Sequence, residues 1–597
     1  MKKHYETHVE DTDKLISVAG PVLDYKSWYE RYRKLMEEQA QRKYGLYTPT
    51  SEGDDDDFPS ITGMIARYSA LGLTNEQMAE NPVWKDLTGN GHDLQMKNFA
   101  WGGMSGVGGY TENYDSNRWH KVASRIDTTW TYKSFNVKSI KVSNIVQLFY
   151  QSSLSDTGFR VLSCTIKVSG LTDGQGIEYV SNGTQQFVIM RIENDGIYHL
   201  PSFDFEAKNA YYGFKFLKLQ ESCNITIEQL PLYPGFILGD GVDDFAVTEK
   251  ELNFEDTYTV YTAFIPFQNN PTRNMILCGA DSKKTFSMQY SSLVYVSFIA
   301  GNNYYINADF VNGLNLFACK RNGNNICIKN LLTNKVVTGT CGDWVENAGL
   351  YYLWKNATYV SFAKAAIAGQ TICNGYFSTD EDDEKVLDWY KKQYPWLFPD
   401  QAWTTVGKTN EDEDRATIAN ITGNGNDLVL SNFGFAEGSG YNEEGEYAGY
   451  LVTDGMDDKV RSSNFTLGKK FTVVGENEIL SNTYANAGIV KVSSFFVFPN
   501  SIGVTCYINR QSKGLAIPSK RLKSICSDGR IYYDDWAEAI DVGGNMESNN
   551  PTPLFLGYQK NEFTRFAFKN LAIYNNKTLS KEDCIKAYIY LQTLKAK

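Results

Sequence analysis

The sequence predicts a mainly β protein of several domains. Aromatic residues make up 14% of the 597 residues, charged residues only 21%, and 49 glycines are spread along the chain. This composition is typical of short strands joined by tight turns, because aromatic side chains favour strands and glycine favours turns. The length corresponds to roughly three or four domains. Two repeated signatures indicate how these domains are organised.

The first signature, Thr-Gly-Asn-Gly-x-Asp-Leu, occurs at 88–94 and returns 334 positions later at 422–428. The second signature, Asp-Gly-x-Asp-Asp, occurs at 240–244 and returns 214 positions later at 454–458. The first copy therefore holds 334 minus 214, or 120, more residues between its signatures than the second copy does. We interpret this excess as one inserted domain.

Residues 1–57 are predicted to form a helical attachment segment that ends in an acidic linker. Asp24 can cap a helix in which Trp28, Tyr32 and Leu35 recur at helical spacing. This spacing suits docking on a partner or a short coiled-coil bundle between copies of the chain. Packing of the helix on its own first domain is the alternative.

The first repeat is predicted to comprise 58–112 together with 232–398. It is expected to begin with a short helix around 62–70 and a second helix that a capping-box pattern opens at Thr74. Residues 96–110 then predict a strand followed by a glycine-rich loop. That loop lacks the Lys-Ser/Thr pair and the following helix of a phosphate-binding loop, so we do not expect nucleotide binding there.

The inserted segment, 113–231, alternates apolar and polar residues in short runs between turn residues, which predicts a β-sandwich. The first repeat resumes with strands and a hairpin at 321–324. The second repeat occupies 399–597. Both repeats end with a strand and a helix, opened by capping-box patterns that begin at Ser378 and Ser580 and carry an acidic residue three positions on.

In this order, the signatures, strands, hairpin and capped helix resemble laminin-G-like domains of the concanavalin A-like lectin superfamily. The resemblance covers about 84–398 and 403–597. It implies two concanavalin A-like jelly-roll sandwiches, with a β-sandwich inserted in the first and a helical anchor at the N-terminus. The second copy departs from the first where Asn420 replaces Asp86, which puts equivalent ligand sites in the two copies in doubt.

The whole arrangement looks like fibre or decoration proteins of tailed phages that infect gut Bacteroidota, crAss-like phages among them. This resemblance implies a virion protein, assembled in the host cytoplasm, that forms a head (capsid-surface) fibre or a tail fibre. We would expect a homo-oligomer, dimer or trimer, joined to other virion proteins through its N-terminus and adhering to host surface polysaccharide. Head and tail positions are not distinguished by the sequence.

Bulk properties exclude several other classes. The net charge of −12 argues against a nucleic-acid partner, whose phosphates require Lys and Arg. No apolar run approaches the roughly 20 residues of a membrane span, and the first residues lack an apolar signal core. The ten cysteines contain no Cys-x-x-Cys pair, so mostly buried free thiols are expected, with some disulfide as the alternative.

The second signature supplies the densest carboxylate clusters of the sequence. Aspartate and glycine in this pattern form structural turns, which is the favoured interpretation. Clustered carboxylate oxygens are also what Ca²⁺ prefers, so calcium binding is the alternative, and catalysis is the least favoured. No other cofactor is expected. The candidate ligands are Asp240, Asp243, Asp244, Asp454, Asp457 and Asp458.

A catalytic constellation is not apparent, since the five histidines are scattered and no carboxylate pair stands out from the acidic background. We therefore expect a binding protein and not an enzyme. A secreted bacterial carbohydrate-binding protein and, less favoured, a polysaccharide-degrading enzyme are the alternatives. Exposed aromatic rings could stack on sugars. The candidates for this role are Trp101, Tyr110, Trp119 and Trp130.

Overall fold

The computed structural model describes residues 57–596 except for short internal segments. The predicted attachment helix with Trp28, Tyr32 and Leu35 lies outside the described residues. None of the described helices is long and apolar enough to cross a membrane. The internal segments that are not described are 112–113, 115–118, 122–125, 140–142, 152–158, 183–185, 206–210, 268–274, 281–285, 291–293, 301, 312, 345–346, 356–361, 437, 444–446, 481–489, 493–494, 500–503, 508–514, 518–520, 541–551, 557 and 560–561.

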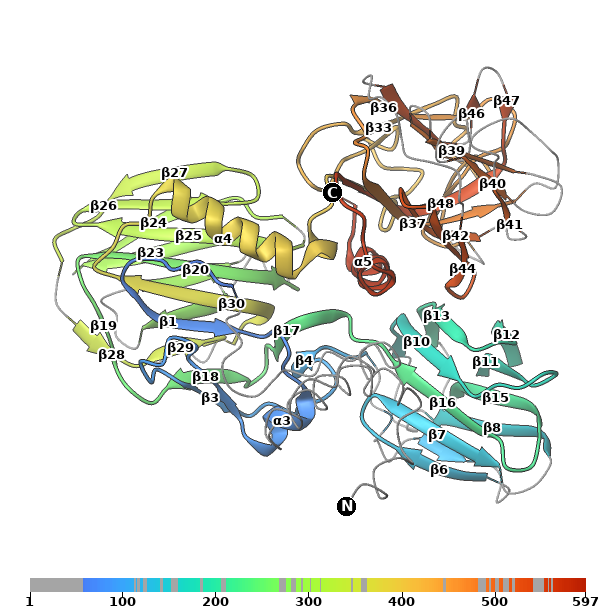
Figure 1. Cartoon of the computed structure of the whole chain (residues 1–597), viewed down its shortest axis with the longest axis horizontal. Helices are drawn as coiled ribbons and strands as arrows, with labels where there is room; N and C mark the ends of the chain where they lie inside the picture. Colours follow the sequence, from blue (N-terminus) through green and yellow to red (C-terminus); the bar gives the residue numbers. More distant parts are fainter. Residues whose placement is uncertain are drawn as a thin grey trace, which may run out of the picture. The chain divides into compact units, whose positions relative to one another are not determined.

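The fold is mainly β, as predicted, and its first sandwich consists of two eight-stranded antiparallel sheets (Figure 1). One sheet runs, in spatial order, β27 (Lys335–Thr340), β26 (Asn325–Asn330), β25 (Asn315–Asn322), β20 (Thr257–Pro266), β30 (Lys364–Asn374), β17 (Tyr233–Asp240) and β4 (Gly106–Gly108), with β1 (Met64–Ser69) also paired to β30. The other runs β2 (Val83–Trp84), β3 (Leu94–Lys97), β18 (Phe245–Thr248), β29 (Tyr351–Leu353), β21 (Met275–Ala280), β22 (Phe286–Tyr290), β23 (Val294–Ala300) and β24 (Asn302–Ala308). Buried side chains of both sheets form one core cluster.

The second sandwich also consists of two eight-stranded antiparallel sheets. One runs β44 (Ala537–Ile540), β43 (Arg530–Tyr533), β42 (Arg521–Cys526), β37 (Phe471–Ile479), β48 (Phe566–Asn575), β35 (Tyr450–Val452) and β34 (Gly440–Asn442), with β31 (Gln401–Thr404) also paired to β48. The other runs β32 (Thr417–Ile418), β33 (Leu428–Ser431), β36 (Lys459–Phe465), β45 (Thr552–Leu556), β38 (Val490–Val492), β39 (Phe495–Pro499), β40 (Val504–Tyr507) and β41 (Leu515–Ile517).

These two sandwiches have the same strand order, element by element. In both, the strand that precedes the final helix pairs with the strand that ends at the second signature, and that strand pairs with a short glycine-bearing strand. In the second copy, β34 and β35 are neighbours in the chain as well as in the sheet. In the first copy, the equivalent β4 and β17 pair in the same way, although twelve strands lie between them in sequence.

Ten of those twelve strands form a separate sandwich of two five-stranded sheets with its own core cluster. One sheet runs β13 (Gly196–Leu200), β10 (Cys164–Ser169), β16 (Asn224–Gln229), β7 (Ser134–Ser139) and β6 (Ile126–Trp130). The other runs β12 (Gln186–Ile192), β11 (Gly176–Asn182), β15 (Tyr211–Leu219), β8 (Ser143–Gln151) and β5 (Trp119–Lys121). The remaining paired strands of the described chain are β9 (Phe159–Val161) with β14 (Phe203–Phe205), β19 (Leu252–Phe254) with β28 (Asn347–Gly349), and β46 (Tyr558–Gln559) with β47 (Glu562–Phe563).

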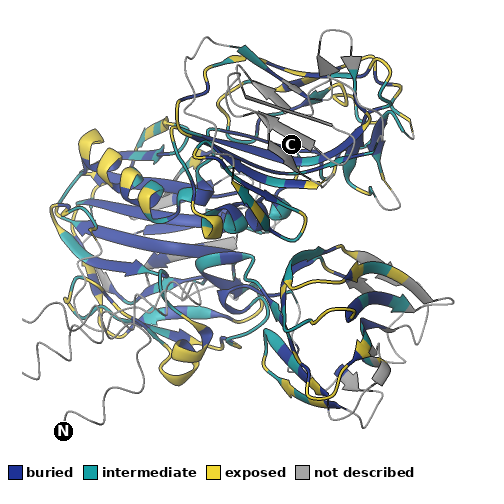
Figure 2. Cartoon of the chain, turned by 45° about the vertical axis from the view of Figure 1, so that its right-hand side comes forward, coloured by how far each residue is buried: buried dark blue, intermediate teal, exposed yellow. Residues whose placement is uncertain are grey.

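Two helices cover the outer faces of the sheets that contain β30 and β48. They are α4 (Asp380–Gln393), which the 3-10 turn η2 (Pro395–Leu397) follows, and α5 (Lys581–Thr593). Their apolar residues pack with outward side chains of these sheets. Both central strands, β20 and β30, are buried along nearly their whole length, whereas α4 keeps an exposed outer face (Figure 2). A short helix, α3 (Asn75–Glu80), precedes β2.

Three local predictions are wrong or displaced. The helix expected around 62–70 is strand β1, because alternate residues Ala66 and Tyr68 enter the core and the backbone pairs with β30. Within the predicted glycine-rich loop, Gly106–Gly108 forms strand β4. The capping box of α4 begins at Thr379 and not at Ser378. The caps predicted at Thr74 and Ser580 are confirmed.

Candidate functional site

The first repeated signature is a loop built around one buried carboxylate. In the first copy, Asp86 Oδ1 accepts hydrogen bonds from the Arg67 N–H and from both the N–H and the hydroxyl of Thr88. Asp86 Oδ2 accepts from the His92 N–H at 3.1 Å. Asp93 in turn accepts the Asp86 N–H at 2.9 Å. The loop itself uses the carboxylate, so this signature is a structural connection.

In the second copy, the side-chain amide of Asn420 takes the central position in the loop. Asn420 Oδ1 accepts from the N–H of Ala402 at 3.1 Å and from the N–H and hydroxyl of Thr422. Asn420 Nδ2 donates to the carbonyl oxygen of Gly425 and to Oε1 of Gln401. The amide therefore donates on the side where the first-copy carboxylate accepts, and in both copies the central side chain is bonded within the protein.

The second signature is a turn closed by its own aspartates. Asp240 Oδ1 accepts from the N–H of Val242 at 2.7 Å and of Asp243 at 3.4 Å. Asp244, which is fully buried, accepts the Asp240 N–H at 2.9 Å through Oδ2. This is the side-chain-to-backbone bonding by which aspartate stabilises turns.

The turn of the second copy has the same geometry. Asp454 Oδ1 accepts from the N–H of Met456 at 2.7 Å and of Asp457 at 3.3 Å, and Asp458 Oδ2 accepts the Asp454 N–H at 2.7 Å. Asp458 Oδ1 also accepts from the hydroxyl of Ser439, in the glycine-rich stretch before β34, at 3.0 Å. The last aspartate therefore ties the turn to that stretch.

Each of these turns also brings three carboxylates together. One oxygen from each of its three aspartates lies within 4.8 Å of the others, in both copies. Among the described residues, these six form the carboxylate groups that could hold a hard cation such as Ca²⁺. The hydrogen bonds above complete the second-copy turn through protein groups, which fits the structural interpretation. In the first copy, Asp244 Oδ1 is buried without a hydrogen-bond partner among the described residues.

Burial raises the pKa of Asp458 to about 6 and that of Asp244 to about 7. A carboxyl whose pKa is raised by folding stabilises the protein below about pH 4, and this contribution is lost as the pH rises through the folded-state pKa. At pH 7.5 the native state therefore bears the cost of burying a charged Asp458.

Asp458→Asn is accordingly expected to stabilise the protein at pH 7.5, by on the order of 1–2 kcal/mol after solvent screening, and to have little effect at pH 4. Asparagine can still accept the Asp454 N–H and donate to Ser439. Urea unfolding followed at the two pH values measures the difference. An identical change in unfolding free energy at both would contradict this assignment.

The aromatic candidates for sugar stacking are mostly covered. Tyr110 and Trp119 are each only 7% exposed, which leaves little ring surface for a sugar to stack on. Trp101 stacks on Phe99 with ring centroids 5.0 Å apart, and Trp130 packs against the core of the inserted sandwich. These last two rings are half-buried.

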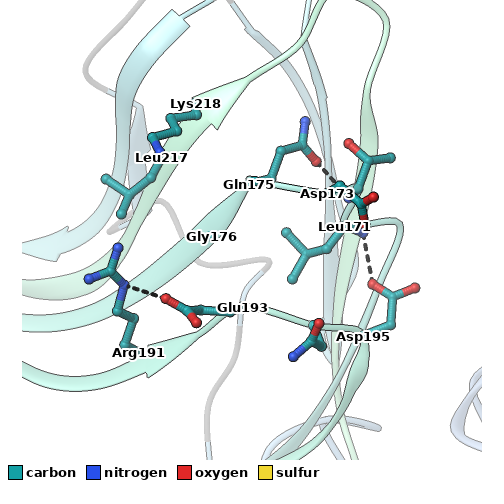
Figure 3. Close-up of a pocket in the computed structure, with 12 residues that line it drawn as sticks. Leu171, Asp173, Gln175, Gly176, Arg191, Glu193, Asp195, Leu217 and Lys218 are labelled. Atoms are coloured by element: carbon teal, nitrogen blue, oxygen red, sulfur yellow. Dashed lines mark hydrogen bonds and ion pairs between the residues drawn. The ribbon is translucent and has the colours of Figure 1, made fainter.

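An open pocket lies on the inserted sandwich (Figure 3). Its volume is about 550 Å³, within the range of roughly 300–1,000 Å³ typical of ligand sites. Three segments line it. They are 171–176, which leads into β11; Arg191 at the end of β12 with 193–195 after it; and 217–218 near the end of β15. Most of the lining side chains are polar.

Asp195 holds two of these segments together. Its carboxylate oxygens accept the N–H of Gly170 at 2.9 Å and of Leu171 at 2.7 Å. Gln175 Oε1 accepts the Thr172 N–H at 3.0 Å, which fixes the turn above the pocket. Gln175 is only 3% exposed, yet its Nε2 has no hydrogen-bond partner among the described residues. Such an orphan donor is unusual in a folded protein.

The charged groups of the pocket differ in how far the protein satisfies them. Arg191 Nε pairs with Glu193 at 3.0 Å, and both side chains are well exposed. Lys218 has no ion-pair partner within the described part of the chain. Its backbone adopts the left-handed conformation, with φ of 54°. This conformation is strained for a non-glycine residue, and residues strained in this way are often found at functional sites.

This pocket was not predicted from the sequence. The turn residues Thr172-Asp173-Gly174 and Asn194-Asp195-Gly196 were available as signals, because both are loop patterns. They predict turns, however, and only the pairing of β10, β11, β12 and β13 brings the two turns to the same end of the sandwich.

Comparisons with known proteins gave no family. No family model matches the chain, and no curated protein matches it. Solved structures with similarity include the binding domain of botulinum neurotoxin serotype D, with 8% identity and a TM-score of 0.27 over 58% of this chain and 89% of that one. Another is the serotype C1 binding domain, with 9% identity and a TM-score of 0.25 over 58% of this chain and 91% of that one.

A third is a structure of botulinum neurotoxin type C, a toxin whose cell entry is described as dependent on interaction with two ganglioside molecules. It shows 10% identity and a TM-score of 0.25, over 57% of this chain and 93% of that chain. What the present chain binds must therefore be inferred from its own residues.

Proposed function

We propose that this chain is an adhesive protein that binds carbohydrate through the pocket of the inserted sandwich. The observation that supports it most directly is the mixture of donors and acceptors around one open depression. Arg191, Asn194 and Lys218 supply donors, and Asp173 and Glu193 supply acceptors. A sugar hydroxyl both donates and accepts, so vicinal hydroxyls need both kinds of group close together.

The shape of the site suits a sugar as well. The partly exposed side chains of Leu171 and Leu217 give the pocket a small apolar surface, on which the C–H face of a pyranose can pack. The rest of the lining is polar and open to solvent, as expected for a ligand that keeps several hydroxyl groups hydrated.

Binding is favoured over hydrolysis because of how the pocket carboxylates are placed. A glycosidase needs one carboxyl group whose pKa is raised by an apolar, water-excluded setting. Glu193 is exposed and paired with Arg191, and Asp195 is exposed and accepts two backbone N–H bonds. Neither is placed as a general acid.

The proposal can be tested by glycan-array binding of the full chain, followed by titration of any hit. Arg191→Ala is expected to weaken binding roughly tenfold or more, since a hydrogen bond to a charged group contributes about 1.5–3 kcal/mol. Asn194→Ala is expected to weaken it by roughly two- to tenfold, since a hydrogen bond to a neutral amide contributes about 0.5–1.5 kcal/mol. Lys385→Ala is the matched control, because it removes an exposed charge of α4 that pairs with Glu381 of the same helix.

Two results would contradict the proposal. The first is an absence of binding to any surface polysaccharide or glycan on the array. The second is a bound glycan whose affinity is unchanged by Arg191→Ala and Asn194→Ala, which would place the site elsewhere on the chain.

We further propose that adhesion takes place on a virus particle, as a head or tail fibre attached through the residues before 57. The support is the resemblance of the sequence to phage fibre and decoration proteins. Labelling of purified particles with an antibody against the chain checks this setting, and particles without the chain would rule it out while leaving the glycan test unaffected.

A further inference from the structure

Two buried cysteines of the second sandwich face each other across the join between a helix and a sheet. Cys526 ends strand β42, and Cys584 lies in the first turns of α5. Both are free thiols with 0% exposure, and their Sγ atoms are 3.9 Å apart. Cysteines 58 positions apart in sequence thus touch in the fold.

The equivalent place in the first sandwich holds a buried ion pair. Lys320 pairs with Thr259 across β25 and β20, as Cys526 pairs with Thr472 across β42 and β37. Asp383 stands four positions after the helix N-cap Thr379, as Cys584 stands four after the N-cap Ser580. Lys320 Nζ and Asp383 Oδ2 are 2.8 Å apart, and the two side chains are 4% and 2% exposed.

The surroundings of the two pairs match in detail. Thr259 Oγ1 accepts the Ser378 N–H and donates to a carbonyl oxygen two residues earlier, and Thr472 Oγ1 makes the same bonds around Leu579. Lys320 Nζ donates to the Ser378 carbonyl, and Cys526 Sγ lies 3.9 Å from the Leu579 carbonyl. Both pairs therefore occupy the equivalent position at which the final helix is tied to its sheet.

The two thiols are not equally acidic. The hydrogen bond between the two thiols lowers the pKa of Cys526, and the nearby guanidinium of Arg530 adds to the effect. The same interaction and burial raise the pKa of Cys584. The thiolate is the attacking form in disulfide exchange, so this difference favours Cys526 over Cys584 as the first thiol to attack.

We propose that Cys526 and Cys584 form a disulfide when the chain meets a small-molecule disulfide such as oxidised glutathione or cystine. The Cys526 thiolate attacks one sulfur, the S–S bond of the small molecule breaks, and its other half leaves and takes up a proton. Cys584 then loses its proton and attacks the Cys526 sulfur, releasing a second small thiol. Two protein thiols are oxidised and one small disulfide is reduced to two thiols.

Because both sulfurs are buried, exchange requires α5 to open transiently, and closure of the helix then aligns the resolving thiol. The product replaces a non-covalent helix-to-sheet contact with a covalent one, at the position where the first sandwich uses an ion pair. A chain made under reducing conditions would thus be locked after its exposure to oxidising surroundings.

The test uses the full chain, incubated with either oxidised or reduced glutathione, then alkylated under denaturing conditions and mapped by mass spectrometry. We expect a linked peptide pair that contains Cys526 and Cys584, only in the oxidised sample. We also expect the thermal midpoint of the second sandwich to rise by about 5–10 °C. Cys584→Ser is expected to abolish both changes, whereas Cys373→Ser, a buried cysteine of β30, is expected to preserve them.

Recovery of both cysteines fully alkylated after long oxidation would overturn the proposal, as would linkage of either one to a different cysteine. So would a linked pair that leaves the thermal midpoint unchanged, because the bond would then not tie the helix to the sheet. The peptide map of the unaltered chain distinguishes these outcomes even if Cys584→Ser fails to fold.

Discussion

Replacing Asp383 with alanine is expected to lower the unfolding free energy of the first sandwich by about 3–5 kcal/mol. Asp383 accepts hydrogen bonds from the hydroxyl of Tyr261 at 2.9 Å and of Ser378 at 3.2 Å, in addition to its ion pair with Lys320. Removal of the carboxylate leaves the Lys320 ammonium group buried without a counter-charge, and this cost exceeds the net benefit of the original pair.

Urea or guanidinium unfolding of Asp383→Ala measures the loss. Asp380→Ala is the control, since Asp380 pairs with the neighbouring Lys329 at 2.6 Å but has an 87% exposed side chain, and exposed pairs contribute little. Equal effects of the two substitutions would show that burial of the network is not what stabilises the helix on the sheet.

Asp86→Ala is expected to cost on the order of 3 kcal/mol, the second largest effect. The substitution removes the acceptor of three backbone N–H groups, those of Arg67, Thr88 and His92, and each unsatisfied buried group costs about 1–3 kcal/mol. The same denaturation experiment measures it. A loss below about 1 kcal/mol would mean that water replaces the carboxylate.

The second copy supplies a matched comparison at Asn420. Asn420→Asp is expected to destabilise the protein, because a carboxylate would face the oxygens of Gln401 and Gly425 that now accept from the amide. If Asn420→Asp were neutral, the opposite hydrogen-bond polarity of the two loops would have no energetic role.

Features fixed by local chemistry could be predicted from the sequence. The mainly β fold class, the hairpin that joins β25 to β26 and the caps of α3 and α5 are confirmed, because turn residues and cap residues act within a few positions of themselves. The cap of α4 is displaced by one residue since Ser378 and Thr379 are both good caps, and a tertiary bond from Ser378 N–H to Thr259 decides between them.

Features that depend on distant partners could not be predicted. Met64–Ser69 becomes a strand only because β30 pairs with it. Trp119 is buried because Tyr212 and Phe214 of β15 pack on its ring, and Tyr110 contacts Tyr132 in the turn after β6. The pocket is formed by three segments that are separated in the sequence, so no local pattern predicts it. The pairs Lys320–Asp383 and Cys526–Cys584 occupy equivalent positions but differ in chemistry, so comparing the two repeats by residue type does not reveal them.

The pairing of β4 with β17 makes the inserted sandwich a hairpin loop of unusual length. In the second copy, the equivalent strands β34 and β35 are joined by the short stretch between Asn442 and Tyr450. The entropic cost of closing a loop increases only slowly with the length of the loop, so a hairpin of the host sandwich can hold a whole folded domain at a modest cost in free energy. This position therefore accepts a folded insert that has its own sheets and core, while the host sandwich keeps the strand order of the second copy.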